Sequence, residues 1–122
     1  MSAPLFVYGT LMRGEASHEL LAGAPFLGDA ATVARFTLVD LGAYPALVEG
    51  GSSAVQGELF ASSAELLAVL DAFEEHPRVY RRAAIELAGG GAAEAYVLPA
   101  QLARGRPAIA GGDWRGRRSS GA

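Results

Sequence analysis

The chain has 122 residues, 51% of them hydrophobic, which fits one folded domain with a single core. Its ten basic residues, all arginine, and thirteen acidic residues give a net charge of −3, which argues against a nucleic-acid-binding domain held by phosphate contacts. With no cysteine and two histidines, the composition excludes disulfides and thiol nucleophiles and disfavours a histidine-rich metal site.

The N-terminus has no basic region followed by a long apolar run, so we expect no membrane span and a cytoplasmic protein.

Short strands separated by turns are predicted for the first half of the chain. Residues 5–8 predict a strand stopped by Gly9, and residues 17–21 a short helix with Ser17 as a candidate N-cap. Further strands are predicted between residues 26 and 48, with breaks at residues 28–29, 40–42 and 44–45.

The second half predicts a strand, one good helix and a hairpin. Residues 54–60 alternate as a strand does, and Ser62 followed by Glu65 fits a capping box that begins a helix ended by Pro77. Residues 80–87 and 92–98 predict a hairpin across three glycines. The pattern favours an α+β domain, a small mixed β-barrel flanked by helices, over residues 1–114, with a polar tail at residues 115–122.

Glu74 occupies a position where an amphipathic helix would place an apolar side chain. It follows Leu67 by seven residues and Leu70 by four, on the same stripe. Burial and the negative end of the helix dipole would both raise the pKa of this carboxylate toward the range suited to proton transfer. An exposed glutamate beside Glu75 at a helix end explains the pattern equally well.

The run Tyr8-Gly9-Thr10-Leu11, at the end of the first predicted strand, is the second candidate site. Gly9 permits a sharp turn and the close approach of a ligand, so that successive amide N–H groups face one anionic group. Taken alone, the four residues fit a plain strand end at a glycine turn better.

Two residues near Glu74 have open roles. Tyr80 is a core aromatic of a strand, or it shares a pocket with Glu74. Asp71 has a structural role, in which it binds a backbone amide or pairs with one of three arginines, Arg78, Arg81 or Arg82.

Three common catalytic and nucleotide-binding motifs are absent from the chain. It has no Gly-x-Ser-x-Gly nucleophile elbow and no Gly-x-Gly-x-x-Gly fingerprint. Gly89-Gly90-Gly91 lacks the lysine and the strand-loop-helix context of a phosphate-binding loop.

Several segments, taken in order, resemble the gamma-glutamylcyclotransferase-like superfamily. They are Phe6-Val7-Tyr8-Gly9-Thr10-Leu11-Met12-Arg13-Gly14, Tyr44-Pro45-Ala46-Leu47-Val48, Val55-Gln56-Gly57-Glu58-Leu59-Phe60 and Leu70-Asp71-x-Phe73-Glu74-x-x-Pro77-x-x-Tyr80-x-Arg82. The resemblance spans residues 4–98 and is to the short branch with a Tyr-Gly-Thr-Leu loop, which includes gamma-glutamylamine cyclotransferases and plant avirulence-induced proteins. Gly111-Gly112-Asp113-Trp114-Arg115 resembles the C-terminal signature of many bacterial members.

The resemblance implies a small mixed barrel and a reaction without metal or organic cofactor. The substrate's own alpha-amino group would attack the gamma-carbonyl of a gamma-glutamyl amide, releasing 5-oxoproline and an amine. Glu74 matches the catalytic glutamate of the family. Tyr8, Gly9, Thr10 and Leu11 match its substrate loop, and Tyr80 matches a supporting aromatic residue.

The alternative is a binding module of the same fold, with a pocket for a small carboxylate or amine ligand and no catalysis. A weaker alternative is an interaction protein that uses the arginine-rich tail. The leaving amine is left open, as a free amino acid, the side chain of lysine, a polyamine-like amine or a tailored natural product. The expected partner is a small gamma-glutamyl substrate, with no nucleic acid or membrane, and the expected state is a monomer.

Overall fold

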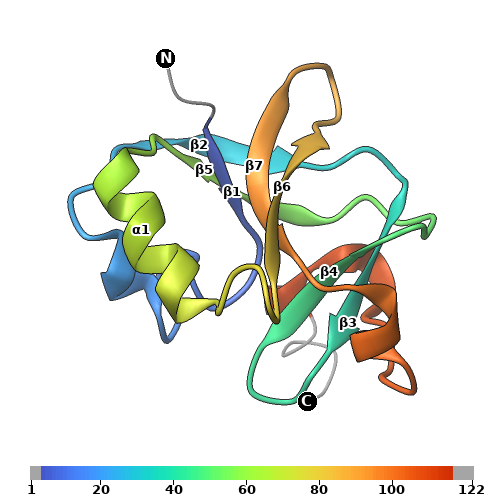
Figure 1. Ribbon diagram of the computed structural model, residues 1–122. Helices are drawn as coiled ribbons and strands as arrows, with labels where there is room; N and C mark the ends of the chain where they lie inside the picture. The colour runs from blue at the N-terminus through green and yellow to red at the C-terminus, as the bar shows by residue number, and fades with distance from the viewer. Residues whose placement is uncertain (1–3, 117–122) are drawn as a thin grey trace.

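The structure, a computed structural model, describes residues 4–116, which form seven strands, one α-helix and three short 3-10 helices. Figure 1 shows α1 beside β1, β2 and β5, while β3 and β4 lie on the other side of the molecule. The bounds are β1 (Leu5–Val7), η1 (His18–Leu21), β2 (Phe26–Ala31), β3 (Phe36–Asp40), β4 (Pro45–Glu49), β5 (Gln56–Phe60), α1 (Ala64–Phe73), β6 (Arg81–Glu86), β7 (Ala92–Val97), η2 (Ala100–Ala103) and η3 (Ala110–Gly112).

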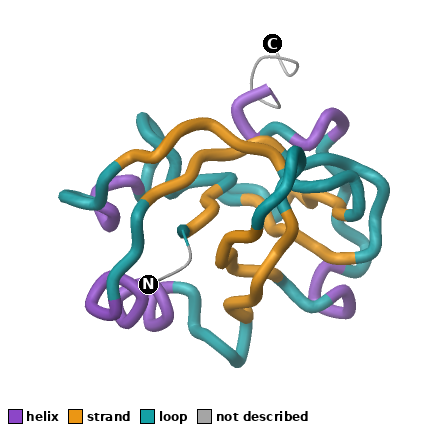
Figure 2. Tube along the Cα trace, turned by 90° about the horizontal axis from the view of Figure 1, so that it is seen from above, coloured by secondary structure: helices purple, strands orange, loops and turns teal. Residues whose placement is uncertain are grey.

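The strands form one mixed sheet in the order β2-β5-β1-β7-β4-β3, with β6 paired to β7. β1 is antiparallel to β5 and parallel to β7, and β4 is also parallel to β7. Figure 2 shows the helices at the periphery of these strands. The α+β class and the mixed sheet are confirmed.

The sheet does not close into the predicted barrel. Each parallel pairing of β7, with β1 and with β4, consists of a single residue pair, so the two halves of the sheet meet only over a short length. One isolated bridge, between Thr32 and Leu87, brings the ends of β2 and β6 together, but no ladder joins the edge strands within residues 4–116. The sheet is curled and open.

Most predicted elements lie within two residues of the observed ones. The hairpin is confirmed as β6 and β7, whose register pairs Glu86 with Ala92 across the three glycines. All three glycines have positive φ, between 85° and 108°, a region that other residues rarely adopt. The strand predicted at residues 54–60 is β5, and the breaks at residues 40–42 and 44–45 separate β3 from β4.

Four local predictions are wrong. The helix predicted to end at Pro77 ends at Phe73, because Glu74 is its C-cap and the amides that follow bond back to the last turn. β2 continues through Gly28, where the register with β5 shifts, because a β-bulge accommodates the glycine without ending the strand. Ser17 precedes η1 but makes no side-chain cap, since the helix is only a short 3-10 turn. α1 is capped by Ser63, not Ser62: the Ser63 hydroxyl accepts the amide of Leu66 at 3.1 Å.

β1 is the strand that positions the site. All three of its residues are buried, with Leu5, Phe6 and Val7 at most 2% exposed, because strands flank β1 on both sides and α1 packs nearby. A strand held on all sides gives a rigid start to the loop that follows it. That loop begins at Tyr8.

The C-terminal part of the described chain packs on the domain. Trp114 is 4% exposed, and Arg115, the first residue of the predicted tail, forms ion pairs with Glu15 and Glu58. Residues 117–122 of that prediction lie outside the described residues.

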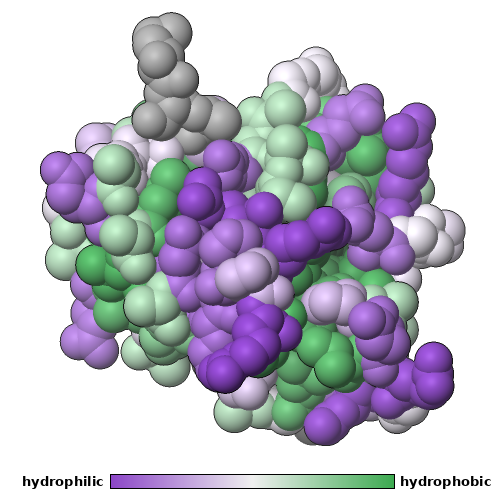
Figure 3. Space-filling model, viewed as in Figure 1, coloured by the Kyte–Doolittle hydropathy of each residue, from purple (hydrophilic) through white to green (hydrophobic). Residues whose placement is uncertain are grey.

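The described surface is mixed in character. On the face of Figure 3, hydrophobic side chains form separate patches divided by hydrophilic ones. None of the helices in residues 4–116 has the length and apolar character needed to cross a membrane.

Candidate active site

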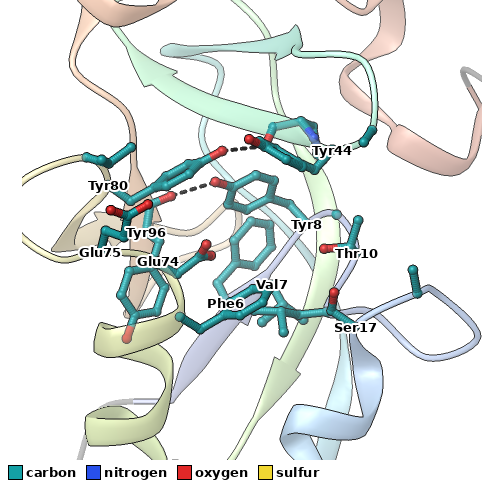
Figure 4. Close-up of a pocket in the computed structure, with 17 residues that line it drawn as sticks. Phe6, Val7, Tyr8, Thr10, Ser17, Tyr44, Glu74, Glu75, Tyr80 and Tyr96 are labelled. Carbon is teal, nitrogen blue, oxygen red and sulfur yellow. Dashed lines mark hydrogen bonds between the residues drawn. The ribbon is translucent and has the colours of Figure 1, made fainter.

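A pocket of about 400 Å³ opens beside the C-terminal end of α1. It is bordered by the end of β1 with its loop, the segment before β4, the end of α1 with the chain that follows it, and one residue of β7 (Figure 4). The lining residues are Phe6, Val7, Tyr8, Gly9, Thr10, Leu11, Ala16, Ser17, Ala43, Tyr44, Pro45, Phe73, Glu74, Glu75, Val79, Tyr80 and Tyr96. All six residues predicted for the site are among them, so the structure brings the two candidate segments together.

The loop after β1 presents backbone groups to the pocket. The amides of Gly9, Thr10 and Leu11 donate no hydrogen bond to another residue within 4–116. Two other hydrogen bonds hold the loop. The amide of Met12 donates to the carbonyl of Gly9 at 3.1 Å, and the amide of Ser17 donates to the carbonyl of Thr10 at 2.8 Å. Its N–H groups can therefore bind an anionic group of a ligand.

Gly9 is required by close packing. A Cβ at this position would lie 2.5 Å from Cγ and 2.7 Å from Cδ of Pro45. A proline ring is fixed to its own backbone and cannot rotate away. Gly9 has no positive φ, so the turn predicted here does not depend on a left-handed glycine.

Tyr8 and Tyr80 use their hydroxyl protons inside the protein. The Tyr8 hydroxyl donates to the carbonyl of Tyr96 at 2.6 Å, and the Tyr80 hydroxyl donates to the carbonyl of Pro45 at 3.0 Å (Figure 4). Burial is the main cause of a raised pKa at both tyrosines. Each therefore provides a neutral aromatic wall, with its hydroxyl proton bonded to a carbonyl.

Glu74 is placed by the end of α1, of which it is the C-cap. The amides of the next two residues, Glu75 and His76, donate to the carbonyls of Ala72 and Asp71 at 3.2 and 2.9 Å. This is the Schellman pattern of helix ends, in which the residue after the C-cap is left-handed, and Glu75 has φ 55°. The backbone at Glu74 is thus set by hydrogen bonds on both sides.

The carboxylate of Glu74 points into the pocket (Figure 4). The residue is half-buried, and its side chain makes no hydrogen bond or ion pair with another residue of the described range. Burial raises the pKa of Glu74 to about 7. The raised pKa predicted from the helical stripe is confirmed with burial as its cause, whereas the predicted contribution of the helix dipole stays a prediction. The group is suited to accept and return a proton near neutral pH.

A polar cluster behind the pocket joins α1 to the hairpin. Arg82 binds Asp71 through Nε and Nη2 and binds Glu94 through Nη1 at 2.9 Å, while the Tyr96 hydroxyl donates to Asp71 at 2.6 Å. Burial alone would raise the pKa of Asp71, but the bonds from Arg82 and Tyr96 outweigh it and lower the pKa. The predicted structural role of Asp71 is confirmed, with Arg82 as its partner.

Some lining residues had no predicted role. Tyr96 lies on β7, and Tyr44 and Pro45 precede or begin β4. Tyr44 and Pro45 belong to a segment that carries the family resemblance, and this resemblance was the one signal in the sequence that could have placed them at the site. Tyr96 had no such signal, because only the register of the sheet places it at the pocket. Within residues 4–116, no group of three or more acidic or histidine side chains is placed to hold a metal ion.

A family model described as "Gamma-glutamyl cyclotransferase, AIG2-like" matches residues 5–116. The chain belongs to this family, and it is an enzyme of the gamma-glutamylcyclotransferase class.

Relatives of known sequence support this assignment. A Vibrio cholerae protein with the provisional name gamma-glutamylcyclotransferase is 43% identical over 110 residues, which cover 90% of this chain and 93% of that protein. The mouse gamma-glutamylaminecyclotransferase is 36% identical over 94 residues, covering 70% of this chain and 63% of that protein.

Solved structures show the same fold. The uropathogenic Escherichia coli protein c4763 superimposes with a TM-score of 0.83 at 25% identity, covering 98% of this chain and 97% of that one. An AIG2-like protein of mouse superimposes with a TM-score of 0.71 at 32% identity, covering 78% of this chain and 76% of that one.

Proposed function

We propose that this enzyme cyclises gamma-glutamyl amides, with Glu74 as the residue that transfers the proton. The observation that carries the proposal is a half-buried carboxylate with a pKa of about 7, which has no partner among residues 4–116. It lies in a pocket whose opposite wall is a loop with three amides that are unbonded within the same residues. The family supports the gamma-glutamyl head group as substrate.

The reaction needs one proton shuttle. Glu74 accepts a proton from the alpha-ammonium of the substrate, and the resulting amine attacks the gamma-carbonyl carbon to form a five-membered ring. As the carbon–nitrogen bond to the leaving amine breaks, Glu74 returns this proton to that nitrogen. After attack the ring nitrogen still carries a second extra proton, which Glu74 transfers to the same amine in the same way, so that the amine leaves as an ammonium ion. The products are 5-oxoproline and a free amine, and Glu74 regains its starting state.

Positioning supplies much of the rate, because the nucleophile and the carbonyl belong to one molecule. We assign the amides of Gly9, Thr10 and Leu11 to the alpha-carboxylate of the substrate, which places the alpha-ammonium toward Glu74. Tyr8 and Tyr80 limit the orientations of the glutamyl chain as aromatic walls. Their burial also lowers the polarity around Glu74, which favours its protonated form.

The amine part of the substrate, which becomes the leaving group, occupies the part of the pocket lined by Tyr44, Phe73 and Val79. Tyr44 and Phe73 are each 47% exposed, so they lie at the mouth. Among the lining residues that the structure describes, the charged groups are the carboxylates of Glu74 and Glu75. This wall favours an amine that is apolar or cationic.

The test is mass-spectrometric detection of 5-oxoproline from a panel of gamma-glutamyl amides. Wild type should release it, and Glu74→Gln, which keeps the shape but cannot shuttle a proton, should lose turnover while it remains folded. Glu65→Gln, the same change on an exposed position of α1, is the matched control and should keep full activity. No product from wild type with any amide of the panel would contradict the proposal.

The cytoplasmic location and the monomeric state stay predictions from the sequence. Fractionation of the host cell and sedimentation of the purified protein test them.

A further inference from the structure

A buried carboxylate lies behind the loop that lines the pocket. Glu58 of β5 is 1% exposed and is not among the lining residues. Its Oε1 accepts the amide N–H of Arg13 at 2.8 Å, and its Oε2 accepts Nε of Arg13 at 3.1 Å. Both terminal nitrogens of Arg115 lie 3.4 Å from the same Oε2.

Glu58 is held as an anion by these two arginines. Burial by itself would raise the pKa of Glu58, but the hydrogen bonds from Arg13 and the charge of Arg115 outweigh it, and the pKa is lowered. A buried charge is costly unless it is paired, and removal of one partner leaves the others unsatisfied. Loss of any one of these contacts would therefore destabilise the whole cluster.

Arg115 also binds the loop directly. Its guanidinium donates to the carbonyl oxygen of Arg13 and lies 3.6 Å from a carboxylate oxygen of Glu15. The segment that carries Arg115 is anchored by Trp114, which is 4% exposed, and a bond from the Arg115 amide to Asp113 at 3.1 Å fixes its local turn. The C-terminal segment thus reaches across to the middle of the loop.

The held residues lie between the two parts of the loop that form the pocket wall. Residues 8–11 and 16–17 line the pocket, while Arg13 and Glu15 between them bind Glu58 and Arg115. The Arg13 guanidinium also lies 3.6 Å above the ring of Phe26 on β2, which gives the loop a further contact behind the pocket. Movement of Arg13 and Glu15 would therefore displace the amides of residues 9–11, which precede them in the loop.

We propose that Arg115, acting through Glu58 and Arg13, is a positioning residue that holds the loop in its substrate-binding conformation. The inference rests on the proposed function, because it concerns the amides assigned to the substrate carboxylate. Arg115 does not line the pocket or approach Glu74, so its loss should weaken binding and leave proton transfer intact.

The experiment compares Arg115→Gln with Arg35→Gln. Arg35 forms an exposed ion pair with Glu86 at 3.4 Å and does not line this pocket, so it is a matched loss of one arginine charge. If Arg115→Gln lowers the fraction of molecules with a formed loop to about one tenth, KM rises about tenfold while kcat stays within about twofold. Arg115→Lys keeps the charge and should show a smaller rise, and Arg35→Gln none.

Two further measurements separate this proposal from the proposed function. In a Glu74→Gln background, calorimetry should show that Arg115→Gln weakens binding of the same gamma-glutamyl amide by a similar factor. Without any substrate, hydrogen exchange of the amides of Met12 and Arg13, which are bonded to Gly9 and Glu58, should become faster in Arg115→Gln and not in Arg35→Gln, with exchange in β1 unchanged. Unchanged loop exchange, or a fall in kcat at constant KM, would overturn the positioning role. Absence of 5-oxoproline from wild type would instead contradict the proposed function.

Discussion

Arg82 binds Asp71 through two parallel hydrogen bonds, from Nε to Oδ1 at 3.0 Å and from Nη2 to Oδ2 at 3.1 Å. Asp71 lies on α1 three residues before Glu74, and Arg82 lies on β6. The pair therefore fixes the end of the helix, and with it the carboxylate in the pocket, to the hairpin. A forked arginine contact gives both energy and direction.

We expect Arg82→Lys to lower both stability and activity, because lysine cannot form the fork. Loss of hydrogen bonds to charged groups of this partly buried cluster should lower the free energy of unfolding by about 1–2 kcal/mol. Arg81→Lys is the control, since Arg81 is 56% exposed and pairs with Glu49 at 3.5 Å. Urea unfolding and 5-oxoproline release measure both effects, and equal behaviour of the two variants would contradict the structural role of the fork.

We expect the stability of wild type to fall as the pH rises from about 5 to 8. The pKa of Glu74 is about 7 in the folded state against an ordinary value of 4.5, so the unfolded chain loses its proton first. The stabilisation is complete below the lower value and is lost as the pH rises through the higher one, by at most about 3 kcal/mol. Glu74→Gln should remove this part of the pH dependence and melt higher than wild type at pH 8. Parallel pH dependence of the two melting temperatures would exclude a strongly raised pKa.

Local sequence patterns predicted the main site because its key residues stand out from the residues directly beside them. Glu74 interrupts the helical stripe of α1, and the Tyr8 loop directly follows the apolar residues of β1. Both signals lie within a few residues, where periodicity and turn chemistry are informative. Their meeting in one pocket follows from the family resemblance and was not derivable from the spacing.

The residues that local patterns missed depend on long-range register. Glu58 appears in the sequence as one member of an alternating strand, and its burial becomes evident only with Arg13 and Arg115, 45 and 57 residues away. Tyr96 likewise meets Asp71 across the fold, 25 residues apart. The barrel prediction failed for the same reason, because closure depends on how many residues pair between distant strands.

We expect Glu75→Gly to stabilise the protein. Glu75 is left-handed, with φ 55°, at the position after the C-cap where glycine is favoured, and relief of this conformation should contribute about 1 kcal/mol. Its ion pair with Arg78 at 2.8 Å is exposed and contributes little. Glu75→Gln keeps the strained backbone and is the control, so it should not gain stability. A lower melting temperature for the glycine variant would show that the side chain of Glu75 stabilises the helix end.

We expect Gly9→Ala to disturb the substrate loop, because its Cβ would overlap the ring of Pro45. Overpacking of this kind costs about 1–3 kcal/mol, and the loop amides should shift, raising KM. Removal of the ring in the double variant Gly9→Ala with Pro45→Ala should recover part of the lost binding. A double-mutant cycle on kcat/KM measures that coupling, and strictly additive effects would show that the contact does not set the loop.

We expect kcat/KM to rise with pH through a midpoint near 7, the pKa of Glu74, because the carboxylate must be ionised to take the first proton. The rate should fall again where the alpha-ammonium of the substrate loses its proton, since ammonium then no longer binds beside the carboxylate. Burial sets the lower midpoint, so a variant that opens the pocket to water, such as Tyr80→Ala, should move it toward the ordinary value of 4.5. Tyr80→Phe keeps the ring and should leave the midpoint in place. A midpoint that stays near 7 in Tyr80→Ala would assign the titration to a group other than Glu74.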